Sequence, residues 1–145
     1  MHKAIEIAQV FLRLSHPECG DIISNLKLQR LLYYAQGFHL AIYGTPLFED
    51  LVEAWNYGPV VPSVYQIYRG HGTGALPVDN STEVHCSISE DQLAIIEEVY
   101  DVYGQYSGLK LMHLTQHEEP WKSTPTGRGN VIDTAKMEQF FRTRL

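Results

Sequence analysis

At 145 residues, the chain is long enough to form one domain with its own hydrophobic core. Hydrophobic residues make up 44% of the sequence and charged residues 19%, which excludes a disordered polar chain. The formal net charge is -6 at pH 7, and Lys and Arg together number only 11. Because nucleic acids are bound mainly through Lys and Arg, this composition favours a basic protein partner over DNA.

The sequence shows neither a signal peptide nor a run of about 18 apolar residues that would cross a membrane. We therefore expect a cytoplasmic protein with no membrane segment. In that compartment Cys19 and Cys86 are expected to be free thiols, although one disulfide between them is left open.

The longest apolar pattern predicts a central buried helix over residues 25–43. Ser24 or Asn25 can cap its first turn, and Gly44 can end it in a left-handed conformation. Apolar side chains lie on more than one side of this helix, which is typical of a helix packed from several directions. We expect Leu28 and Leu31 to belong to the core.

The whole pattern predicts a mainly α fold with a small β element (α+β), forming a single domain over residues 1–145. Further helices are expected over about 2–14, 60–70, 89–103, 109–116 and 133–144. A short strand is expected over 51–57, and a strand over 84–88 could pair with it. Residues 117–129 are expected to form a loop.

Three polar side chains form a narrow edge on the otherwise apolar central helix. Lys27, Arg30 and Tyr34 are three and four residues apart, so they are neighbours on its surface. Two interpretations stay open, an ordinary solvated helix face and a surface that contacts a partner.

Candidate chemistry is sparse. His113 and His117 are four residues apart and share a helix face, so their imidazoles could bind zinc. A third ligand would have to come from His71, His85 or Cys86, and the alternative is a histidine pair at a helix end that contacts carbonyls or a carboxylate. We expect no catalytic residue, no cofactor and no metal, and hence a protein that is not an enzyme.

Three segments match family motifs: Leu26–Phe48, Glu53–Tyr65 and Leu114–Trp121. They resemble the signatures of the Panacea domain, which occurs in SocA-like antitoxins and GepA-like phage-associated proteins. The third segment departs from the family pattern Leu-Thr-His-x-x-x-Pro-Trp, because Gln116 stands where that pattern has histidine and His117 follows it.

The resemblance implies a mostly helical domain with a small β element and an antitoxin-like role. Family members neutralise a toxin by direct contact, and SocA-like members also present it to a cytoplasmic ATP-dependent protease. The expected partners are thus a cognate toxin encoded next door and such a protease. Many family antitoxins carry a second, often DNA-binding, domain; this chain has no room for one, so DNA is not expected as a partner.

The resemblance and the polar edge together give four candidate partner-binding residues, Lys27, Arg30, Tyr34 and Tyr57. The variable loop over residues 70–88 is the alternative contact region. Two other functions stay open, a DNA-binding regulator of a mobile element and a metal-dependent enzyme that uses His113 and His117.

Overall fold

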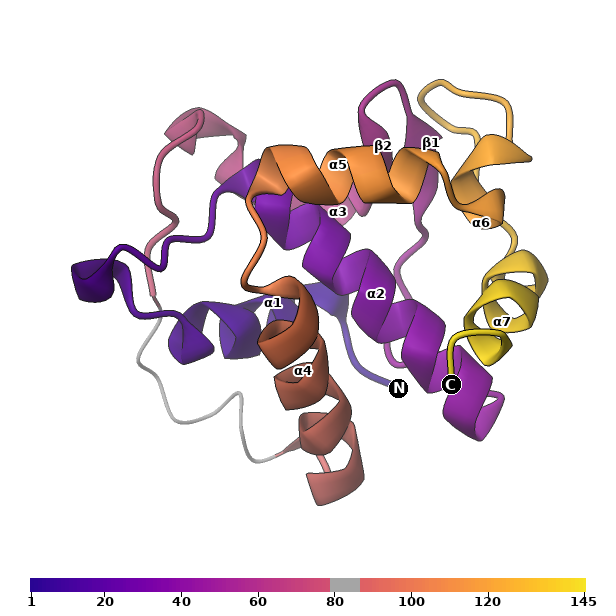
Figure 1. The fold of residues 1–145 in the computed structure, drawn as a ribbon, viewed down its shortest axis with the longest axis horizontal. Helices are drawn as coiled ribbons and strands as arrows, with labels where there is room; N and C mark the ends of the chain where they lie inside the picture. The colour runs from indigo at the N-terminus through magenta and orange to yellow at the C-terminus, as the bar shows by residue number, and fades with distance from the viewer. Residues whose placement is uncertain (79–86) are drawn as a thin grey trace.

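Helix α2, Asn25–Tyr43, lies at the centre of the fold, with the other helices packed around it (Figure 1). The structure is a computed structural model that describes residues 1–78 and 87–145. The Ser24 hydroxyl accepts a hydrogen bond from the Lys27 backbone N–H and caps the helix. Gly44 ends it with φ 73°, a left-handed conformation that favours glycine. The sequence prediction of a central helix over 25–43 is confirmed.

The surrounding helices confirm a mainly α fold with a small β element. They are α1 (Ala4–Leu14), α3 (Pro62–Tyr68), α4 (Glu90–Tyr103), α5 (Gly108–Gln116), α6 (Glu119–Lys122) and α7 (Thr134–Arg142), with single 3-10 turns η1 at Pro17–Cys19 and η2 at Arg69–His71. No helix in the described residues is both long and apolar enough to cross a membrane. The expected loop over 117–129 is partly wrong, because α6 lies inside it: Pro120 is tolerated in a first helical turn.

The β element is a two-stranded antiparallel hairpin. Strand β1, Glu53–Trp55, pairs with β2, Gly58–Val60, so that Trp55 lies opposite Gly58. The other edge of β1 is also occupied, since Ala54 N–H donates to the Asn130 carbonyl and Ile132 N–H to the Val52 carbonyl. Both edges of β1 are therefore occupied by segments other than the expected strand over 84–88. Residues 84–86 lie outside the described residues, as does any disulfide to Cys86.

The core forms where α2 meets its neighbours on several sides. Leu28 and Leu31 are fully buried, as predicted. Phe141 of α7 packs edge-on against the rings of Tyr33 and Tyr34. A Cβ atom at Gly37 would lie only 2.1 Å from the Phe141 ring, so the missing side chain lets α7 approach α2 closely.

Candidate protein-interaction site

The polar edge of α2 is an interior feature, which differs from the exposed edge that helical spacing predicts. Lys27, Arg30 and Tyr34 are all buried, with Arg30 only 1% exposed. Because α4, α5 and α7 all pack against α2, even its polar side is covered. The interpretation of the three residues as a solvated helix face is wrong.

Arg30 extends from α2 to the turn between the two strands. Its guanidinium donates hydrogen bonds to the carbonyl oxygens of Tyr57 and Leu26. Burial lowers the Arg30 pKa to about 10, so the group is still charged at neutral pH. Within the described residues it forms no ion pair with a carboxylate, and its Nε is buried without a hydrogen-bond partner. The buried Arg30 cation thus holds the turn between β1 and β2 from the protein interior.

Gly58 allows this approach. Its φ of 118° is a conformation that favours glycine, and a Cβ atom there would lie 2.9 Å from an Arg30 guanidinium nitrogen and 3.0 Å from Thr115 Oγ1. The turn can therefore sit directly on Arg30 only if residue 58 has no side chain.

Two further side chains fix the turn from α5 and α6. The Gln116 amide donates to the Asn56 carbonyl at 3.2 Å, and the Trp121 indole N–H donates to the Trp55 carbonyl at 2.8 Å. The carbonyls of three successive residues, 55, 56 and 57, are thus each held by a side chain from another element. Tyr57 itself is 69% exposed, so its ring is presented on a restrained backbone.

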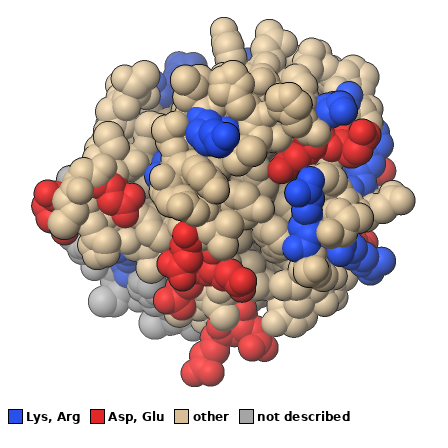
Figure 2. All heavy atoms as spheres, viewed as in Figure 1, with Lys and Arg blue, Asp and Glu red and all other residues tan. Residues whose placement is uncertain are grey.

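The outer side of α5 continues the surface around Tyr57. We call this surface the α5–hairpin face and define it by six residues that are exposed or half-buried: Asn56, Tyr57, Leu109, Met112, His113 and Gln116. None of these six carries a formal charge when histidine is neutral; Lys110, also exposed on α5, is the one Lys or Arg of that helix. Figure 2 shows mostly uncharged residues over the upper part of this side, where α5 and the hairpin lie, whereas Asp and Glu gather lower down over α4.

A half-buried carboxylate, that of Glu118 at the N-cap of α6, lies against α2. Glu118 accepts hydrogen bonds from the hydroxyls of Tyr33 (3.0 Å) and Tyr34 (2.9 Å). Burial raises the Glu118 pKa to about 7, although the two tyrosine hydrogen bonds and the nearby Arg144 charge oppose that shift. The Tyr34 ring stacks on Tyr103 of α4, with centroids 3.9 Å apart. This cluster joins α2, α4 and the start of α6.

Lys27 joins α2 to the end of α4. Its ammonium group donates to the Gly104 carbonyl, the C-cap of that helix. Burial lowers the Lys27 pKa, while the charge of Asp21 opposes the shift. Lys27 therefore anchors a helix end and does not face solvent.

The histidine pair has a local structural role. The His117 ring contacts the His113 carbonyl at 2.7 Å, which matches the expected alternative of a histidine at a helix end. Both side chains are exposed. Among the described residues, no three potential metal ligands come together; His85 and Cys86 lie outside that part of the chain.

All three motif segments converge on the hairpin: the first supplies Arg30, the second the turn, and the third Gln116 and Trp121. The sequence model of the family described as "Antitoxin SocA-like, Panacea domain" matches residues 28–122. This range contains nearly all of the three segments. The chain belongs to the SocA-like antitoxin family. Its Panacea domain contains the hairpin, α5 and most of α2.

The sequence of one curated relative supports this assignment. The chain is 34% identical to antitoxin SocA of Caulobacter vibrioides (strain NA1000 / CB15N) over 120 residues. The matched region covers 76% of this chain and 64% of that protein, so the chain spans less than two thirds of its relative's length. No solved structure matches the chain significantly.

Sequence reasoning missed three residues that shape this site. Glu118 and Trp121 lie in the expected loop and Gln116 at the end of the expected helix over 109–116, and nothing in their local pattern shows what they contact. The only available signal was the third motif, which contains all three.

Proposed function

We propose that this Panacea domain is an antitoxin that neutralises a cognate toxin by direct contact, and that Tyr57 lies at the centre of the contact. The observation that carries the proposal is the exposed Tyr57 ring on a turn whose three carbonyls are fixed from below. A restrained backbone lowers the entropy lost on binding, and tyrosine is one of the residues that dominate binding energy at interfaces.

The other three candidate residues act from beneath this surface. Arg30 holds the Tyr57 carbonyl, Tyr34 binds Glu118 next to α6, and Lys27 holds the end of α4. We propose that they influence toxin binding by positioning the α5–hairpin face rather than by touching the toxin.

The composition of the α5–hairpin face supports a protein partner. Interface centres are depleted of charged residues and enriched in Tyr and Met, and both features occur here. The overall charge of -6 would also steer a basic toxin toward the domain. A basic recognition helix, which the alternative of a DNA-binding regulator needs, is not part of this face.

The test is co-expression with the neighbouring open reading frame under separately inducible promoters. We expect the neighbour alone to stop growth, and this protein to restore growth and to co-purify with it. If the neighbour is harmless and nothing co-purifies, the antitoxin function is excluded.

A matched pair of variants then tests the contact surface. Tyr57→Ala should weaken toxin binding by about tenfold or more, the effect of losing a central interface residue, without changing the urea midpoint. Leu51→Ala is the control, because Leu51 is similarly exposed, at 59%, but lies outside the α5–hairpin face. If neutralisation occurs and both variants bind equally well, the toxin binds elsewhere.

Delivery of the toxin to an ATP-dependent protease is a second part of the proposal. The toxin half-life should fall several-fold when this protein is present, and ATP depletion should restore it. A toxin that is neutralised but not degraded would limit the function to direct inhibition.

A further inference from the structure

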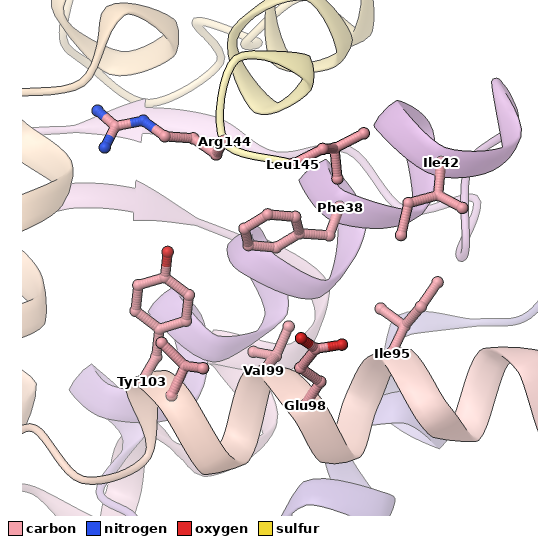
Figure 3. A pocket seen from close by; sticks show the side chains of 9 residues that line it. Phe38, Ile42, Ile95, Glu98, Val99, Tyr103, Arg144 and Leu145 are labelled. Carbon is pink, nitrogen blue, oxygen red and sulfur yellow. The ribbon is translucent and has the colours of Figure 1, made fainter.

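A second surface, separate from the α5–hairpin face, is an apolar groove of about 360 Å³. It lies between α2, α4 and the C-terminal turn (Figure 3). Phe38 and Ile42 line it from α2; Ile95, Val99 and Val102 line it from α4; and Leu145 closes one side. These residues come from helices far apart in the sequence, and none of them is used by the interaction site described above.

The groove is open, which argues against a small-molecule site. Ile42 is 47% exposed, Val102 45% and Leu145 69%. A small-molecule pocket buries most of its ligand, whereas three of the apolar side chains here project to the surface. Contiguous exposed apolar side chains of this kind mark sites of protein interaction.

Helix α4, which forms one wall of the groove, has only acidic charged residues. Helix α4 contains five acidic residues and neither Lys nor Arg: Glu90, Asp91, Glu97, Glu98 and Asp101. In the described part of the chain, none of these carboxylates forms an ion pair. Glu98 lines the groove, and Figure 3 shows its carboxylate beside Val99 and Ile95. Figure 2 shows the acidic residues gathered over α4.

The opposite wall carries a positive charge. Arg144 lines the groove and stacks over the Phe140 ring at 4.8 Å. The two walls therefore differ in sign, which would fix the orientation of a charged occupant.

We propose that this groove is a docking site for an amphipathic helix of a partner protein whose flank facing α4 carries Lys or Arg. An apolar helix face with side chains at i, i+3, i+4 and i+7 fits a groove between two helices. The basic flank would pair with the unpaired carboxylates of Glu98 and its neighbours, and uncharged or acidic residues would face Arg144.

The test uses two labelled synthetic peptides of about four helical turns with the same apolar face. One carries Lys at every flanking position and the other carries Glu, and their binding to the full chain is followed by fluorescence anisotropy. We expect the Lys peptide to bind at least about tenfold more tightly than the Glu peptide. No toxin is present, so the result is independent of the antitoxin proposal.

Neighbouring glutamates provide a matched control for nonspecific attraction. Glu98→Lys and Glu97→Lys change the net charge equally, and both residues are exposed on α4, but only Glu98 lines the groove. We expect Glu98→Lys to weaken Lys-peptide binding about tenfold and Glu97→Lys to change it less than about twofold. Equal weakening by both variants would overturn the proposal, because the peptide would then respond only to overall charge.

A second pair of variants tests the apolar part of the groove. Val102→Asp should abolish peptide binding, whereas Ile67→Asp, at an exposed position on α3, should not. Failure of the Lys peptide to bind the unaltered protein would overturn the proposal. So would a concentration-dependent dimer in sedimentation that Glu98→Lys dissociates, since the groove would then be an interface between two copies.

Discussion

Arg30 keeps a positive charge in the interior and uses backbone carbonyls to stabilise it. Its two hydrogen bonds run to the Leu26 and Tyr57 carbonyls. Such a group adds little net stability, because its desolvation offsets the hydrogen bonds that it gains. What it adds is a fixed position for the turn that presents Tyr57.

Replacing Arg30 should therefore show that it positions the turn of the hairpin while contributing little to the stability of the fold. Arg30→Met removes the charge and keeps most of the volume, so we expect the free energy of unfolding to change by no more than about 2 kcal/mol. Amides 56–58 should exchange with solvent faster, because the Tyr57 carbonyl loses its partner, and toxin binding should weaken. Lys110→Met on exposed α5 is the control; unchanged exchange in Arg30→Met would show that Arg30 does not hold the turn.

Glu118 should make stability depend on pH. Its folded pKa of about 7 lies above the ordinary value of 4.5, mainly because of burial, so the folded state holds a proton that the unfolded state releases. Its stabilising contribution is complete below pH 4.5 and is lost as the pH rises through 7. The expected loss is up to about 3 kcal/mol across that range.

The Glu118→Gln variant isolates this effect. Urea titrations at a series of pH values give the difference in unfolding free energy between the protein and the variant. This difference should change between pH 4.5 and pH 7 and stay constant above pH 7. Because both proteins contain His39, taking this difference also cancels the His39 contribution. Burial lowers the His39 pKa, so its stabilising effect is lost as the pH falls. The groups that face Glu118 are Tyr33, Tyr34, Tyr103 and Arg144. A pH-independent difference would mean that Glu118 is ionised in the folded state.

At the scale of elements, the contact between α2 and α7 depends on Gly37. Alanine there would place its Cβ 2.1 Å from the Phe141 ring, and the clash should outweigh the better helix propensity of alanine. We expect Gly37→Ala to lower the free energy of unfolding by about 1–3 kcal/mol in urea denaturation. Gly70→Ala is the control, because a Cβ there meets nothing within 4 Å.

A double variant tests whether the clash is the cause. Adding Phe141→Leu to Gly37→Ala should recover part of the lost stability, since the smaller side chain leaves room for the methyl group. If the effects of Gly37→Ala and Phe141→Leu on the free energy of unfolding simply add, the Phe141 ring does not clash with a side chain at residue 37.

The hairpin is the element in which the sequence prediction was least complete. A strand over 51–57 was expected, but the second strand is 58–60, which begins with Gly-Pro and is too short for an alternating pattern. Hydrogen bonds between residues 127–132 and the segment 51–57 occupy the edge of β1 that β2 leaves free. Pairing between distant segments leaves no local periodicity, so the sequence could not reveal this arrangement.

For the whole molecule, we propose that the chain unfolds as one cooperative unit. Helix α2 contacts α1, α3, α4, α5, α7 and β2. These elements therefore share one hydrophobic core in the described part of the chain. The unfolding curves from far-UV circular dichroism and from tryptophan fluorescence should coincide. Trp55 is in β1 and Trp121 donates a hydrogen bond to its carbonyl, so an earlier fluorescence transition would show that the hairpin region unfolds by itself.

By itself, the sequence determined the elements with strong local signals. The spacing of apolar residues predicted helix 25–43, Ser24 and Gly44 set its ends, and the motifs indicated the family. The tertiary structure decided which polar residues are buried. Helical periodicity places Lys27, Arg30 and Tyr34 on one edge of a helix, but it does not show that α4, α5 and α7 cover that edge. Whether a polar side chain faces solvent or a distant group depends on contacts between segments far apart in the sequence, such as Lys27 with Gly104, 77 residues away, and these exist only in the folded chain.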